Sequence, residues 1–199
     1  MIDPYNIVRY DYTDAQLEEL AIFCICVAGK TARVIAPRVH KLINKGQNHS
    51  PFEVVRSYSQ PHLAFNMKTV GIGCHNQKAE SVKELAHSGL DLRKCSVSDL
   101  EAIKGIGPKT SRFFIMSSRK GVQHAALDVH LTSWLRDIGV SKVPKQTPSG
   151  KKYIELEKIY LKAVPDGYSP AEWDLIVWKY YSNKIGNFPV PNAAFDVPN

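Results

Sequence analysis

The sequence contains no long apolar run. The longest, residues 20–28, is about half of the roughly 18 residues that a membrane-spanning helix needs. The opening residues, Met1 to Tyr5, are neither basic nor followed by an apolar stretch, so no secretory signal is expected. These absences argue against a membrane protein and an exported one, and they predict a protein of the cytoplasm or nucleoid, or of the nucleus in a eukaryote.

Cysteine is also scarce. The chain has four: Cys24, Cys26, Cys74 and Cys95. Only Cys24 and Cys26 lie close together, and their spacing suits neither a zinc knuckle nor a redox pair. Their apolar neighbours predict buried thiols that pack as small hydrophobic residues. We therefore expect no disulfide framework and a reducing compartment.

The alternating pattern of a half-buried strand is nearly absent, whereas helix start signals recur. Capping boxes are predicted at Thr13–Gln16, Ser50–Glu53 and Ser169–Glu172, each ahead of apolar residues at helical spacing. Further helices are expected over residues 31–45, 61–70, 76–87, 98–103, 108–118, 130–138 and 151–163. Pro37 should kink or split its helix, and the proline-containing tail 187–199 should be extended. The sequence thus predicts an all-α protein.

Positive charge is in excess, with 26 Lys and Arg against 19 Asp and Glu, a net charge of +7. This excess favours a polyanionic partner only weakly, because many basic proteins bind no acidic ligand. At 199 residues and 44% apolar, the chain can form one large domain or two small lobes with a hydrophobic core.

One segment narrows the choice of partner. A short helix is expected to end at Ile103, Gly105-Ile106-Gly107 forms a tight turn, and a second helix starts at Pro108. The main-chain amides of such a turn and the N-terminus of the new helix can bind an anion. Cationic side chains near the turn are Lys104, Lys109 and Arg112. The segment fits a helix-hairpin-helix that binds a DNA phosphate without reading sequence; the alternative is an ordinary corner between two helices.

Lys109 and Asp128 are the candidate reactive groups. Lys109 lies in the first turn of a helix near two other cations, which disfavours its ammonium form, and a neutral amine can form a Schiff base. The alternative is a solvated lysine that touches phosphate. Asp128 precedes a helix and is read in isolation as its N-cap. It stands 19 residues after Lys109, enough for one helix and a return loop, so the two groups can meet in one cleft.

The stretch from Gly73 to Trp134 resembles the helix-hairpin-helix-Gly-Pro-Asp superfamily of DNA glycosylases, which includes endonuclease III and the 8-oxoguanine glycosylases. Residues 76–79 resemble the family segment before the hairpin, and Ile103–Thr110 resembles its hairpin. Asp128-Val129-His130 matches the Asp-Val-His of the oxoguanine branch. Lys104 replaces the usual hairpin proline.

The resemblance implies that a damaged nucleotide is flipped out of the duplex, that Lys109 attacks C1′ of its sugar, and that Asp128 stabilises the developing positive charge. A Schiff base and β-elimination would follow. It also implies DNA contacts by His130 and by hairpin residues, namely Lys104, Gly105, Ile106, Gly107, Thr110 and Arg112. A monovalent cation would be bound by the carbonyls of Glu101, Ile103 and Ile106. The tail lacks cysteine, so no iron–sulfur cluster is expected.

Other site predictions rest on position. Residues 28–31 resemble the family's wedge loop, with Lys30 and Arg33 as candidates to fill the gap left by the flipped base; a simple link between helices is the alternative. The candidates to stack on the flipped base are Phe113, Trp173, Trp178 and Tyr181. Their helical spacing fits core packing equally well.

The sequence therefore predicts a two-lobed, all-α base-excision-repair glycosylase with lyase activity on abasic sites. One lobe would comprise residues 29–127, the other residues 1–28 plus 128–199, with the active-site cleft between them. The expected substrate is duplex DNA containing an oxidised purine such as 8-oxoguanine, bound by a monomer. Removal of oxidised pyrimidines such as thymine glycol, and a non-catalytic DNA-binding module, remain alternatives.

Overall fold

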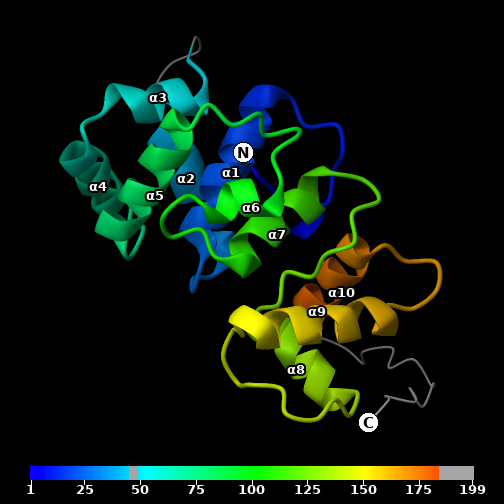
Figure 1. Cartoon of the computed structure of the whole chain (residues 1–199). Coiled ribbons are helices and arrows are strands. Elements are labelled where there is room, and N and C mark those ends of the chain that lie inside the picture. The colour runs from blue at the N-terminus through cyan, green and yellow to red at the C-terminus, as the bar shows by residue number, and fades with distance from the viewer. Residues whose placement is uncertain (45–48, 184–199) are drawn as a thin grey trace. The chain divides into compact units, whose positions relative to one another are not determined.

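The computed structural model describes residues 1–44 and 49–183 (Figure 1). Over these residues the chain forms ten α-helices and one short 3₁₀ helix, with no strand, which confirms the all-α prediction. The expected tail, 187–199, lies outside the described residues. The chain divides into two compact units, Met1–Arg119 and Lys120–Asn199.

The first unit is built around a central helix, α1. It contains the 3₁₀ helix Pro4–Asn6 and the helices α1 (Asp14–Val27), α2 (Ala32–Ile43), α3 (Pro51–Ser57), α4 (Gln60–Thr69), α5 (His75–His87), α6 (Val97–Glu101) and α7 (Pro108–Ser118). The α1 helix contacts α2, α3, α5 and α7. From residue 20 to residue 27 it is apolar on every side and buried, as expected for a helix enclosed by others. The predicted burial of Cys24 and Cys26 is confirmed.

The second unit contains α8 (Val129–Asp137), α9 (Gly150–Ala163) and α10 (Pro170–Asn183). Its core is rich in aromatic rings. Trp134 of α8 packs edge to face against Tyr160 of α9 and Trp173 of α10, with ring centroids 5.7 and 5.9 Å apart. Such T-shaped pairs add to the stabilisation that area burial gives.

Local capping explains where several helices begin. All three predicted capping boxes, Thr13–Gln16, Ser50–Glu53 and Ser169–Glu172, are formed. Pro37, however, lies inside α2 and does not split it. One lost amide hydrogen bond is tolerated there because the opposite face of α2 is anchored in the core, for example by Ile35 and Val39, each 1% exposed.

The two units differ from the expected lobes. The prediction joined residues 1–28 to the C-terminal lobe, but α1 packs within the first unit. The boundary also falls at Arg119 rather than at 127. None of the helices described is both long and apolar enough to span a bilayer.

Candidate functional site

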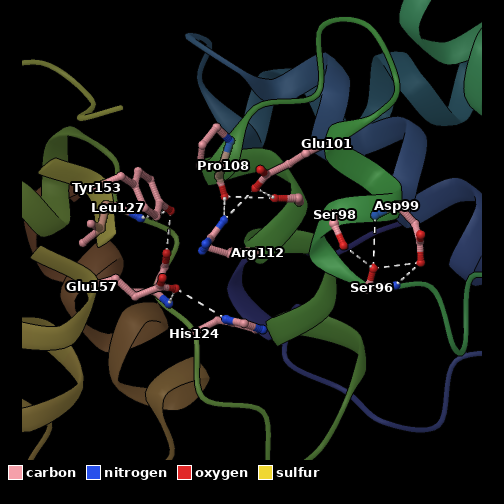
Figure 2. Close-up of polar contacts among 12 residues, drawn as sticks. Ser96, Ser98, Asp99, Glu101, Pro108, Arg112, His124, Leu127, Tyr153 and Glu157 are labelled. Carbon is pink, nitrogen blue, oxygen red and sulfur yellow. Dashed lines mark hydrogen bonds and ion pairs between the residues drawn. The ribbon is translucent and has the colours of Figure 1, made fainter. Parts of the chain in front are cut away.

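The predicted hairpin between α6 and α7 is present. A capping box of Ser96 and Asp99 starts α6 (Figure 2). After α6, the Ile106 amide donates to the Ile103 carbonyl at 3.0 Å, which closes the turn. Both isoleucines are buried, at 7% and 5% exposure, so the turn is anchored in the core.

The two hairpin glycines have different roles. Gly105 has φ +86°, and a Cβ there would clash with the Ser81 Oγ of α5. Gly107 is extended, at φ −95° and ψ −179°, and a Cβ there would meet nothing within 4 Å. Gly105 is thus needed for folding, whereas at Gly107 the absence of a side chain leaves the start of α7 open to a ligand.

Two of the three cations expected near the turn are paired with carboxylates. Lys104 Nζ lies 2.8 Å from Glu80 Oε1, and this hydrogen bond raises the pKa of Lys104. Arg112 Nη1 lies 2.7 Å from Glu101 Oε1, which also accepts a hydrogen bond from Ser111 at 2.9 Å (Figure 2). Arg112 also donates to the Pro108 carbonyl at 3.3 Å, so it holds the first turn of α7.

Lys109 stands in that first turn, half-buried, beside an aromatic wall. Its Nζ lies 4.1 Å from the ring centroid of Phe113. The Phe113 ring lies 6.5 Å from that of Phe23 on α1. Burial raises the pKa of neighbouring Cys24 to about 12, while the charge on Lys109 acts in the opposite direction. The Lys109 amine therefore lies at the edge of an apolar wall.

Asp128 is the N-cap of α8, so the structural interpretation of this residue is confirmed. Its Oδ1 accepts from the amides of His130 at 2.8 Å and Leu131 at 3.0 Å. No hydrogen bond to Oδ2 is formed by the residues that the structure describes. The cap therefore uses only one of the two carboxylate oxygens. Since Lys109 belongs to the first unit and Asp128 to the second, their approach in a cleft stays a prediction.

Sequence reasoning missed the residues that support Asp128. Tyr153 and Glu157 of α9 bind the main chain of residues 125–127, just before Asp128 (Figure 2). Neither lies within a motif. The signal available was their spacing of four residues, which places both on one face of a helix.

The wedge candidates Lys30 and Arg33 are both exposed. Lys30 follows α1 and packs closely on Gly73, where a Cβ would lie 2.9 Å from Lys30 Cε. Beneath this turn, Lys78 of α5 is buried and donates to the carbonyls of Cys26 at 2.6 Å and Ala28 at 3.2 Å. Desolvation lowers the pKa of Lys78. The turn is therefore fixed to α5.

The candidate base-stacking aromatics are dispersed. Trp173 is 3% exposed and forms part of the second unit's core. Trp178 is half-buried on α10. Tyr181 donates to Asp137 Oδ2 at 2.5 Å and packs against the same core. Phe113 differs because it adjoins Lys109.

Metal ligands do not cluster: no group of three His, Cys, Asp or Glu side chains suited to a metal occurs in residues 1–44 and 49–183. The three carbonyl groups proposed for a monovalent cation all belong to the hairpin just described.

The fold and sequence match known proteins. A family model described as "Ogg-HhH: 8-oxoguanine DNA glycosylase" matches residues 1–166. No curated protein matches the chain. The 8-oxoguanine glycosylase/lyase of Methanocaldococcus jannaschii, solved with DNA containing 8-oxoguanine, superposes with a TM-score of 0.68 at 21% identity, covering 89% of this chain and 86% of that one.

The same fold recurs in two further solved structures. The 8-oxoguanine DNA glycosylase of Thermotoga maritima gives a TM-score of 0.68 at 24% identity, covering 92% of this chain and 89% of that one. A trapped endonuclease III–DNA covalent intermediate gives a TM-score of 0.66 at 17% identity, covering 97% of this chain and 93% of that one.

Proposed function

The chain belongs to the 8-oxoguanine DNA glycosylase family, and we propose that it excises 8-oxoguanine from duplex DNA and then cuts the strand through Lys109. The observation that carries the proposal is the placement of Lys109. It follows a phosphate-binding type of hairpin directly, and its amine lies against the Phe113 ring rather than in a carboxylate pair.

The hairpin would hold DNA by its backbone. Its exposed amides and the N-terminus of α7 suit a phosphate oxygen, and Gly107 leaves room for it. His130, half-buried in the first turn of α8, and the exposed Lys30 and Arg33 are proposed to bind DNA near the lesion. Contacts of this kind carry no base specificity, so the hairpin serves any sequence.

The chemistry starts when the damaged nucleotide is flipped out of the duplex into the active site. The Lys109 amine attacks C1′, the bond from C1′ to the base breaks, and the base leaves with its electron pair and takes up a proton. The open oxygen of Asp128 stabilises the positive charge that develops on the sugar. Ring opening then gives a Schiff base, loss of the 2′ proton expels the 3′ phosphate, and hydrolysis restores Lys109.

The proposal includes a monovalent cation at the hairpin, held by the carbonyls of Glu101, Ile103 and Ile106, and no iron–sulfur cluster. Carbonyl oxygens suit such ions. The Ile103 oxygen accepts one hydrogen bond from Ile106, and a carbonyl has a second lone pair to offer. We further propose that the protein acts as a monomer in the compartment that holds the DNA.

Borohydride reduction tests the role of Lys109. Borohydride should trap a covalent complex between the protein and a lesion-bearing duplex, and Lys109→Gln should abolish it. Full trapping by the variant would rule out Lys109 as the nucleophile. Binding without trapping by the unaltered protein would indicate a non-catalytic DNA-binding module.

Asp128→Asn separates the charge of this residue from its cap. Asparagine caps helices as well as aspartate does, so thermal stability should be retained. Base release should slow by on the order of 10²-fold, the usual effect of losing such a charge. Unchanged turnover would leave Asp128 as a cap only.

A cleavage panel of duplexes tests the substrate. Duplexes carrying 8-oxoguanine opposite each base should be cut, and a thymine glycol duplex should not. Preferential cutting at thymine glycol would instead indicate an enzyme for oxidised pyrimidines.

A further inference from the structure

The segment that leads to Asp128 has no regular structure. Residues 122–128 form no helical turn, yet Ala125 and Leu127 are 0% exposed and Ala126 is 2% exposed. Buried amides and carbonyls need partners, because water cannot reach them. Such a segment would normally be paired with another strand, and the part of the chain described here has none.

Two side chains of α9 supply these partners. The Tyr153 hydroxyl donates to the Ala125 carbonyl at 2.6 Å and accepts from the Leu127 amide at 3.1 Å. Glu157 Oε1 accepts from the Ala125 amide at 3.0 Å. One hydroxyl and one carboxylate thus replace the hydrogen bonds that a neighbouring strand would provide (Figure 2).

These contacts fix the main chain on the N-terminal side of Asp128. The amide of Leu127, the preceding residue, is held by Tyr153. On the C-terminal side, Oδ1 of Asp128 is held by the amides of α8. With the chain fixed before it and one carboxylate oxygen fixed after it, the direction of Oδ2 is set.

We propose that Tyr153 and Glu157 are positioning residues for Asp128, which orient its second oxygen toward the sugar. The proposal rests on the role assigned to Asp128 under the proposed function. Neither side chain needs to touch DNA, since each acts through the main chain of residues 125–127. A misplacement of about 1 Å in a catalytic group is enough to slow a reaction.

Tyr153→Phe tests the proposal because it removes only the hydroxyl and keeps the buried ring. Single-turnover base release from a lesion duplex should slow about tenfold, while the Kd for the same duplex stays within twofold. The matched control is Tyr160→Phe. Tyr160 lies on the same helix, is also 0% exposed, and donates to the Pro170 carbonyl at 2.7 Å, away from the segment. The Tyr160→Phe protein should lose as much stability as Tyr153→Phe does, but it should release the base at the wild-type rate.

A double-mutant cycle distinguishes positioning from general loosening. In the Asp128→Asn background, Tyr153→Phe should have no further effect on the rate, because the charge it orients is already gone. The same tenfold loss in both backgrounds would overturn the proposal, as would an equal loss in Tyr160→Phe. A wild-type rate in Asp128→Asn alone would instead refute the proposed function of Asp128, so the two failures are distinguishable.

Glu157 provides a second pair of variants if Tyr153→Phe does not fold. Glu157→Leu removes the acceptor for the Ala125 amide and should slow base release about tenfold. Glu157→Gln keeps an acceptor oxygen and should restore most of the rate. A Glu157→Leu protein as fast as the wild type would refute the role of Glu157.

Discussion

Arg112 offers a direct choice between a structural and a DNA-binding role. Its side chain is 8% exposed and its Nη1 lies 2.7 Å from Glu101 Oε1; the Glu101 side chain is 33% exposed. Arg112→Met keeps the apolar stem and removes the charge. Breaking a fully buried ion pair costs about 3–5 kcal/mol. Here Glu101 keeps the Ser111 hydroxyl at 2.9 Å and some solvent, so we expect a loss of about 2 kcal/mol.

Thermal unfolding and salt-dependent DNA binding together provide the assay. A loss of about 2 kcal/mol lowers the Tm of a protein of this size by roughly 4–8 °C. Each phosphate contact contributes about 0.9 to the slope of log affinity against log salt. Because the Arg112 guanidinium is bound to Glu101, Arg112→Met should leave that slope unchanged. Glu101→Gln is the matched control, and the two losses should not be additive.

The opposite pattern would refute this reasoning. If Arg112→Met keeps its Tm and reduces the slope by about 0.9, then Arg112 binds a phosphate. The ion pair with Glu101 would then give way to DNA in the complex.

The hairpin glycines and the thiols yield further predictions. Gly105→Ala should destabilise the fold by about 2 kcal/mol or more, given its φ of +86° and the close Ser81 Oγ. Gly107→Ala should keep the Tm but weaken DNA binding. A lower Tm for Gly107→Ala than for Gly105→Ala would contradict both roles. A thiol reagent should label exposed Cys74 in the native protein, and Cys24 and Cys26 only after unfolding. Burial raises the pKa of these two buried thiols from 9.0 to about 12. Their contribution to stability should therefore be complete below pH 9 and lost as the pH rises toward 12. Denaturant unfolding at a series of pH values measures this loss.

Local signals in the sequence predicted most helix starts. The capping box at Ser50–Glu53 is an example, because it involves contacts over only three residues. The turn at Gly105 was predicted for a similar reason, but the cause of its constraint was not: Ser81 lies 24 positions earlier in the chain. Only the packing of α5 against the hairpin brings the two together.

Contacts between residues far apart in the sequence could not be predicted from the sequence. DNA binding by Arg112 stays a prediction, but its ion pair with Glu101 could not be predicted from the sequence. Trp173 was a stacking candidate by residue type, yet it packs on Trp134. Tyr153 contacts the main chain of residues 26 and 28 positions away, a separation at which no periodicity carries information.

The α5 helix fixes the spacing between two places expected to meet DNA. Lys78 binds the carbonyls at the end of α1, beside the wedge turn, and Ser81 lies against the hairpin at Gly105. These residues are three positions apart, about 4.5 Å along a helix. A helix does not stretch, so the wedge turn and the hairpin should move as one body. A duplex that binds to both must then bend to match a spacing that the protein fixes before DNA binds.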